Sequence, residues 1–213
     1  VNLSLHNDFY DRFKRHERID IRKKVYQSKI FQPRLTLTSN YFSGHSIIFG
    51  IEHTTDELTS DRFVNRKMTT RALHETEYFL QDEWTADNHW MLSTGVRTNF
   101  SKAFGFMYMP KIAVKYSPDE HWAVRANYSM GYRAPSIKEL FFNWDHLGMF
   151  QIRGSEDLKP EKNHYCSLGA EYTNKGFFMN VNAYANFFRK KIEGVWRIYA
   201  VSYTHLTLPT TPY

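Results

Sequence analysis

The alternation of apolar and polar residues is the feature that most restricts the fold of this chain. From Trp122 to Tyr132 every second residue is apolar or aromatic, and the residues between them are small, polar or charged. Successive side chains of a β-strand point to opposite faces, so a period of two predicts a strand with one apolar and one polar face. A sandwich strand on a soluble core has this pattern, and so has a barrel strand with lipid outside and water inside.

The same alternation recurs along the chain, and no segment has a convincing helical period. The segments that show it are residues 1–11, 30–42, 45–54, 75–85, 89–100, 106–117, 121–133, 163–173 and 177–188. We therefore expect an all-β chain of about nine strands, paired as an antiparallel up-and-down meander. Its open edges should be the strand that begins at Val1 and a strand around residues 192–199.

The connections between these segments alternate in length. Short connections rich in Gly, Pro, Asn, Asp and Ser are Ser43–Gly44, Ala86–Asn88, Pro118–Glu120 and Asn174–Gly176. Longer connections lie at residues 12–28, 55–74, 100–106 and 135–162. Short turns on one side and long loops on the other are typical of an outer-membrane barrel. The basic run at 12–24 is then a solvated loop and not a nucleic-acid site.

The two faces of the expected sheet differ in chemistry. The polar face, expected to be concave, carries Arg34, Arg97, Lys111, Lys115, Arg125, Asn127, Asn180 and Asn182. The apolar face, expected to be convex, carries Leu35, Ile47, Leu92, Val114, Tyr128, Leu168 and Val181. Near the short turns it also carries Tyr41, Trp84, Trp90, Tyr116, Trp122 and Tyr172. Such aromatics match a membrane-interface girdle, although they also fit the edge of a sandwich core. Asp82 fits this face poorly, and its place near a turn limits the cost.

Composition excludes several other classes of protein. The mean hydropathy is −0.58, and no run of about 18 apolar residues is present to form a transmembrane helix. Cys166 is the single cysteine, so neither an internal disulfide nor a multi-cysteine metal site can form. Two pairs of possible metal ligands do not make a metal site. His74 and Glu75 project to opposite faces of a strand, and His164 and Cys166 supply only two ligands. No catalytic motif is present, so we expect no enzyme, no cofactor and no metal.

Two segments, GYRAPSIKELFF at 131–142 and EDLKPEKNHYCSLGAEY at 156–172, resemble the C-terminal half of TonB-dependent outer-membrane receptors. The resemblance is closest to the branch that serves ferric siderophores and colicins. YFLQDEW at 78–84 and FRKKIEGVW at 188–196 are also similar to that family. Ser155–Glu156 replaces the family's usual Asn-Pro. The motif residues are Gly131, Tyr132, Arg133, Pro135, Ser136, Leu158, Pro160 and Glu161.

The resemblance implies an open fragment of a large transmembrane β-barrel of about 22 strands in the bacterial outer membrane, in contact with its lipid. It further implies active import of a scarce ligand with energy from the TonB complex, reached only through an N-terminal plug region that this chain lacks. A ferric siderophore is the expected ligand, ahead of haem, cobalamin or oligosaccharide. A passive porin-like or adhesin barrel is the alternative function, and a soluble sandwich comes third.

The segment between Pro135 and Pro160 is unusually aromatic for a loop. It can pack on itself beneath the barrel mouth, bind a ligand, or do both. The candidate ligand-binding residues are Phe141, Phe142, Trp144, His146, Phe150 and Arg153. A haem ligand could use His53, His74 and His146, which are more simply read as loop residues.

The expected domain boundaries follow from where the barrel pattern stops. Residues 1–199 form the partial receptor barrel. Residues 200–213, which include SYTHLTLPTTP, are similar to translated sequencing-adapter read-through, and a genuine Thr/Pro-rich linker is the alternative.

Overall fold

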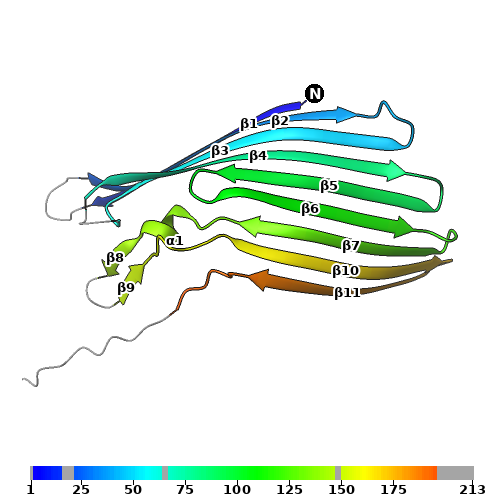
Figure 1. The fold of residues 1–213 in the computed structure, drawn as a ribbon. Helices are drawn as coiled ribbons and strands as arrows, with labels where there is room; N and C mark the ends of the chain where they lie inside the picture. The colour runs from blue at the N-terminus through cyan, green and yellow to red at the C-terminus, as the bar shows by residue number, and fades with distance from the viewer. Residues whose placement is uncertain (1, 16–21, 64–66, 147–149, 196–213) are drawn as a thin grey trace, which may run out of the picture.

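Nine strands form one open antiparallel sheet (Figure 1). The computed structural model describes residues 2–15, 22–63, 67–146 and 150–195, with only the backbone of residues 12–15, 22–24, 146 and 150. The sheet consists of β1 (Asn2–Arg15), β2 (Arg22–Ser39), β3 (His45–Ser60), β4 (Thr69–Thr85), β5 (Trp90–Ser101), β6 (Gly105–Tyr116), β7 (Trp122–Arg133), β10 (Glu161–Asn174) and β11 (Phe177–Arg189). Between β7 and β10 the chain forms α1 (Ile137–Phe141) and the hairpin of β8 (Asn143–His146) with β9 (Phe150–Arg153).

The expected all-β meander that does not close is confirmed. Each strand pairs antiparallel with the next one in the chain, except that β7 pairs with β10 across the inserted α1–β9 segment. The edge at β1 is as predicted. The prediction of an edge strand at 192–199 is wrong for its described part, because residues 192–195 form no strand and β11 is the second edge. Residues 196–199 lie outside the described residues.

The register confirms the two chemically different faces. One row across the sheet joins Leu92, Val114, Ala126 and Leu168, and a neighbouring row joins Leu35 to Ile51. On the opposite face a row joins Arg34, Glu52, Glu77 and Asn99. The residues assigned to each face from the sequence have the parity of these rows, except Tyr41, which lies beyond the end of β2 and has no partner in the ladder.

The apolar face has no second sheet packed on it among the described residues. Leu168 and Val181 on this face are 58% and 60% exposed. A soluble monomer rarely exposes so large an apolar surface to water, whereas the outer face of a membrane barrel is apolar and contacts lipid. The soluble sandwich is therefore rejected.

Three of the four long connections are shorter than predicted, because the strands continue into them. β1 and β2 run on to Arg15 and from Arg22, so most of 12–28 is paired strand with a bulge at Arg12/Phe13. Likewise β3 reaches Ser60 and β4 starts at Thr69. Only three residues, 102–104, separate β5 from β6. The alternation weakens at these strand ends, and the ladders of backbone hydrogen bonds continue without it.

Proline ends one ladder early. β6 pairs with β7 only from Lys111 to Tyr116, although its pairing with β5 continues to Gly105. Pro110 has no N–H to donate, so the β6–β7 ladder stops at this point. β7 continues to Arg133 alongside β10 and then leads into α1. The prediction of no helix is wrong here: α1 is only five residues long, too short for a helical period to be visible.

The short turns are confirmed, and they carry the aromatic residues expected beside them. Trp90 packs on Tyr116 with ring centroids 4.4 Å apart, and Trp122 packs on Tyr172 at 4.8 Å. Asp82, which fitted its face poorly, has a partner: its Oδ2 lies 2.8 Å from Nδ1 of His45. This pairing offsets the cost of placing a carboxylate on the apolar face.

Candidate functional site

The helix α1 begins at a capping box. Ser136 Oγ accepts a hydrogen bond from the Glu139 N–H at 3.3 Å, and Glu139 Oε2 accepts one from the Ser136 N–H at 2.8 Å. Pro135 precedes the box and cannot extend the ladder of β7. Ile137 and Leu140 are buried, and Ile137 joins a small apolar core with Leu58, Phe63 and Phe142. This core fastens α1 to the ends of β3 and β4 that lie away from the short turns.

Backbone hydrogen bonds hold the rest of this segment, which we call the rim segment (residues 137–146 and 150–155). The Asn143 N–H donates to the Arg62 carbonyl at 2.9 Å, and the Ser155 N–H donates to the Glu139 carbonyl at 2.9 Å. The Gly154 N–H donates to the Phe142 carbonyl at 2.6 Å. A Cβ at Gly154 would stand 2.5 Å from the Glu139 carbonyl oxygen, so the return of the chain past α1 requires glycine.

Three cations lie on aromatic rings where the rim segment meets β2–β4. The Arg62 guanidinium lies 4.2 Å from the centroid of the Trp144 ring. Arg71 lies 4.7 Å from Phe141, and the Lys138 ammonium lies 5.4 Å from Tyr26. Such contacts stabilise a cation by roughly 0.5–2 kcal/mol, depending on how far water is excluded. They concentrate positive charge among aromatic side chains at one end of the sheet.

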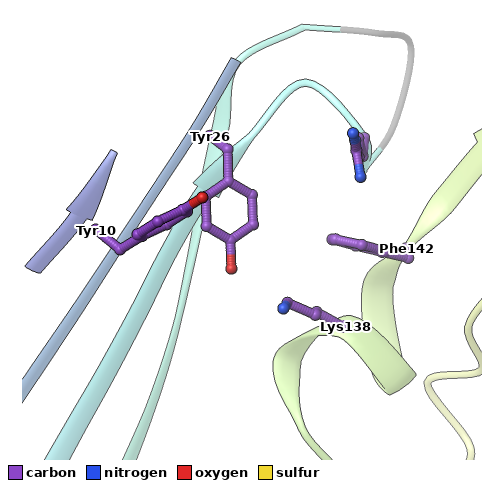
Figure 2. A pocket seen from close by; sticks show the side chains of 5 residues that line it. Tyr10, Tyr26, Lys138 and Phe142 are labelled. Atoms are coloured by element: carbon purple, nitrogen blue, oxygen red, sulfur yellow. The ribbon is translucent and has the colours of Figure 1, made fainter. Parts of the chain in front are cut away.

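A cavity of about 170 Å³ opens beside these contacts (Figure 2). Figure 2 shows Tyr10 and Tyr26 on the strand side, with Lys138 and Phe142 opposite them. Arg62 completes the lining. Among the described residues no carboxylate lines the cavity, and none forms an ion pair with Arg62 or Lys138; Asp56 interacts with Lys138 at longer range. The lining therefore suits a ligand that presents negative charge together with an aromatic or apolar group.

Arg133 joins α1 to the strands. Its Nη1 donates to Glu139 Oε2 at 3.0 Å, and its Nε donates to Glu161 Oε2 at 2.9 Å. Glu161 also accepts a hydrogen bond from the Ile192 N–H. Burial alone would raise the pKa of the Glu139 carboxyl, but hydrogen bonds from Arg133 and Ser136 outweigh it and hold that pKa below its ordinary value.

The structure places the candidate ligand-binding residues named from the sequence in different surroundings. Phe141, Phe142 and Trp144 are brought together against β2–β4, and Phe142 both packs in the apolar core and lines the cavity. Arg153 lies opposite Asn143 in the β8–β9 hairpin and is exposed, away from the cavity lining. The other two candidates, His146 and Phe150, pair with each other across the hairpin, and their side chains lie outside the described residues.

The motif residues occupy the junction between β7, α1 and β10. Gly131 stands opposite Asn163, where a Cβ would meet the amide oxygen at 2.0 Å. Tyr132 and Arg133 end β7, Pro135 is buried, and Ser136 caps α1. Leu158 donates its N–H to Ser155, and Pro160 is buried just ahead of Glu161, which starts β10. The motif therefore shapes the base of the rim segment.

Two histidines named for the haem alternative lie elsewhere. His53 and His74 share the parity of Ile51 and Tyr78, on the apolar face. His53 Nδ1 lies 2.9 Å from Thr76 Oγ1, and His74 Nδ1 lies 3.2 Å from Thr55 Oγ1. Within the described ranges no three His, Cys, Asp or Glu side chains form a group that could hold a metal ion. No helix in the same ranges is long and apolar enough to cross a membrane.

Four residues of the cavity lining were not named from the sequence: Tyr10, Tyr26, Arg62 and Lys138. Tyr10, Tyr26 and Arg62 come from β1, β2 and the β3–β4 connection, far from the aromatic loop in the chain, whereas Lys138 lies in α1, inside the quoted segment 131–142. Basic and aromatic residues do mix at the strand ends away from the short turns, but the basic run that we interpreted as a solvated loop, residues 12–24, contains none of these four residues.

Comparison with known proteins settles the family. The family described as "TonB dependent receptor-like, beta-barrel" matches residues 2–203. This chain belongs to the TonB-dependent receptor family. It is a partial barrel of that family, located in the bacterial outer membrane. The short turns are then the periplasmic ends of the hairpins, and the rim segment lies at the outer end.

Among curated relatives, the chain is 30% identical over 155 residues to the iron-regulated outer membrane virulence protein of Vibrio cholerae serotype O1 (El Tor Inaba). The match covers 71% of this chain and 24% of that protein, so the chain spans about a quarter of the relative's length.

Solved structures share the fold. A variant of the ferric enterobactin receptor (PfeA) from Pseudomonas aeruginosa, in complex with enterobactin, matches with TM-score 0.73 and 17% identity over 90% of this chain and 32% of that one. The siderophore receptor PirA from the same organism matches with TM-score 0.64 and 17% identity over 76% and 31%. The copper transporter OprC also matches, with TM-score 0.58 and 13% identity over 87% and 34%. The fold alone therefore does not decide the ligand.

Proposed function

We propose that this chain is part of the barrel of an active importer that binds an anionic ferric siderophore at its outer rim and moves it inward with TonB-supplied energy. The observation that carries the proposal is the cavity lined by Arg62, Lys138, Tyr10, Tyr26 and Phe142. Among the described residues the lining contains two cations and no carboxylate, which favours a negatively charged ligand, and the rings favour one that stacks or packs.

The relatives support the same ligand class. A curated relative is named for iron regulation, and two structural neighbours are named as siderophore receptors, one of them in complex with enterobactin. A bare metal cation, such as the copper that OprC is named for, would be repelled by Arg62, Arg71 and Lys138. An iron ion enclosed by an anionic chelator presents the negative charge of the chelator instead, and this charge is complementary to the cations at the rim.

The test is uptake of radioactive ferric enterobactin by cells that carry the complete receptor as their only route for that chelate. We expect uptake that stops when an uncoupler collapses the proton gradient, and binding at the cell surface that persists. Uptake that continues with the uncoupler would favour the passive porin-like alternative. Absence of both binding and uptake would contradict a siderophore ligand of this class.

A further inference from the structure

Lys138 and Glu139 are neighbours in α1 that serve different partners. Residues four apart share one face of a helix, so Lys138 and Phe142 lie together, and both line the cavity. Glu139 projects about a quarter of a turn away from Lys138 around the helix axis, and it accepts a hydrogen bond from Arg133 at the end of β7. The rotation of α1 about its own axis therefore decides whether Lys138 faces the cavity.

The geometry points to Arg133 as the positioning residue of the ligand site: by clamping Glu139 against β7 and β10, it fixes the rotation of α1 and holds Lys138 in the cavity. This inference rests on the proposed function for the identity of the ligand. The clamp itself stands on the contacts. Arg133 donates from Nη1 to both Glu139 oxygens, at 3.1 and 3.0 Å, and from Nε and Nη2 to the two Glu161 oxygens, at 2.9 and 3.1 Å.

An isolated surface ion pair contributes little, because water screens it and both side chains lose freedom. Arg133 differs because one planar guanidinium is shared by two carboxylates. Nη2 also donates to Glu139 Oε1 at 3.2 Å, so each carboxylate has two donors, a geometry that fixes orientation as well as distance. Helix α1 is also too short to hold its own orientation, since a helix of five residues lies far below the length that is stable alone. The apolar contacts of Ile137 and Leu140 hold it against the sheet, and the clamp adds a directional restraint.

The barrel contains a matched control pair. Arg125 and Glu171 also lie on β7 and β10, on the same polar face, and form an ion pair of the same kind. They lie near the short-turn end and make no described contact with α1. Neutralising them removes an equivalent charge pair from the same two strands without touching the clamp.

The first experiment measures the affinity of the complete receptor in detergent for ferric enterobactin. Glu139→Gln keeps the N3 capping function, because glutamine also serves in a capping box, but removes the ion pair. We expect Glu139→Gln and Arg133→Gln to raise Kd about tenfold, and Arg125→Gln and Glu171→Gln to change it less than about twofold. In a Lys138→Ala background, Glu139→Gln should have little further effect, because the residue that it positions is gone. Additive losses in that double variant would overturn the positioning role.

The second experiment needs no ligand, so it separates failure of the clamp from failure of the proposed function. We expect Glu139→Gln to speed amide hydrogen exchange at Leu140 and Phe142, whose N–H groups donate to Ser136 and Lys138 within α1. Unchanged exchange in both amides would overturn the clamp whatever the receptor binds. Faster exchange in a receptor that does not bind ferric enterobactin would support the clamp and reject the proposed ligand.

Discussion

The ring of Phe79 occupies the space where Gly50 would carry a side chain. A Cβ at Gly50 would stand 2.1 Å from Cζ of Phe79, its partner across the β3–β4 ladder. Arg34 and Arg97 flank the same ring, with guanidinium carbons 6.0 and 5.4 Å from its centroid. Filling the bare backbone of a glycine with a cross-strand aromatic ring is a known way of stabilising a sheet.

Gly50→Ala should therefore destabilise the complete receptor, because the new methyl group displaces the Phe79 ring from between the two arginines. We expect a loss of about 1–3 kcal/mol in the free energy of unfolding by urea in detergent micelles. Gly194→Ala is the control, since among the described residues no atom beyond its chain neighbours lies within 4 Å of the added Cβ. Replacing the ring by a smaller side chain, in Phe79→Leu, should recover part of the unfolding free energy lost in the Gly50→Ala variant. If it did not, the steric explanation would be wrong.

Gly154→Ala should disturb α1 without disturbing the sheet. The added Cβ would lie 2.5 Å from the Glu139 carbonyl oxygen and 2.8 Å from the Leu140 carbonyl carbon, so the rim segment must move away. We expect a higher Kd for ferric enterobactin at nearly unchanged unfolding free energy, because the hydrogen-bond ladder of β10 begins only at Glu161. An equal change in both quantities would show that the glycine supports the whole barrel.

Lys138 and Arg62, the two cations of the cavity lining, should increase the affinity for an anionic ligand. Replacing Lys138 by Ala or Arg62 by Gln removes positive charge and an aromatic contact from the lining, and each should raise Kd for ferric enterobactin about tenfold. Lys175→Ala, in a short turn at the other end of the sheet, is the matched loss of one charge and should have little effect. A neutral ferric trihydroxamate that bound as tightly as ferric enterobactin would show that charge does not select the ligand.

The lowered pKa of the Glu139 carboxyl predicts how the stability of α1 depends on pH. Its pKa is lower in the folded protein than the ordinary value expected in the unfolded chain. Its contribution to stability is therefore fully present above the ordinary carboxyl pKa, and it is lost as the pH falls through the lower, folded value. The protection of the α1 amides, which is their exchange relative to the intrinsic rate at each pH, should be high at neutral pH and should fall as the medium is acidified below the ordinary carboxyl range. Glu139→Gln should remove this loss of protection in acid, and its persistence in that variant would assign it to another group.

The faces of the sheet were predictable from sequence because they depend only on the parity of residues within a strand. Leu92 and Arg97 were assigned to opposite faces on this basis, and the register bears this out. The strand ends were not predictable in the same way. Beyond the apolar stretch, β1–β4 continue with mixed polar and aromatic residues, so the sequence period fades although backbone pairing goes on.

The candidate site could be predicted only in part. Phe142 and Trp144 stood out as aromatics concentrated in one loop. Tyr10 and Arg62 reach the same cavity from strands and connections far away in the chain, and only the register of β1–β4 shows that they meet. The motif residue Arg133 was recognised, but its partner Glu139, which lies in the same quoted segment after the last motif residue Ser136, was not singled out.

Cysteine labelling tests the central claim most directly, namely that this chain is a barrel wall with its apolar face on lipid and its polar face on the lumen. Cys166 is the chain's single cysteine, exposed on the apolar face beside Tyr128 and Ala185, and Ser167 points to the opposite face. The complete receptor, with any other cysteines replaced, is reconstituted in lipid vesicles. We predict that Cys166 reacts with a membrane-soluble maleimide and is protected from a charged one, whereas Ser167→Cys in a Cys166→Ser background reacts with the charged reagent. Rapid reaction of Cys166 with the charged maleimide, with protection of the cysteine at 167, would contradict the account.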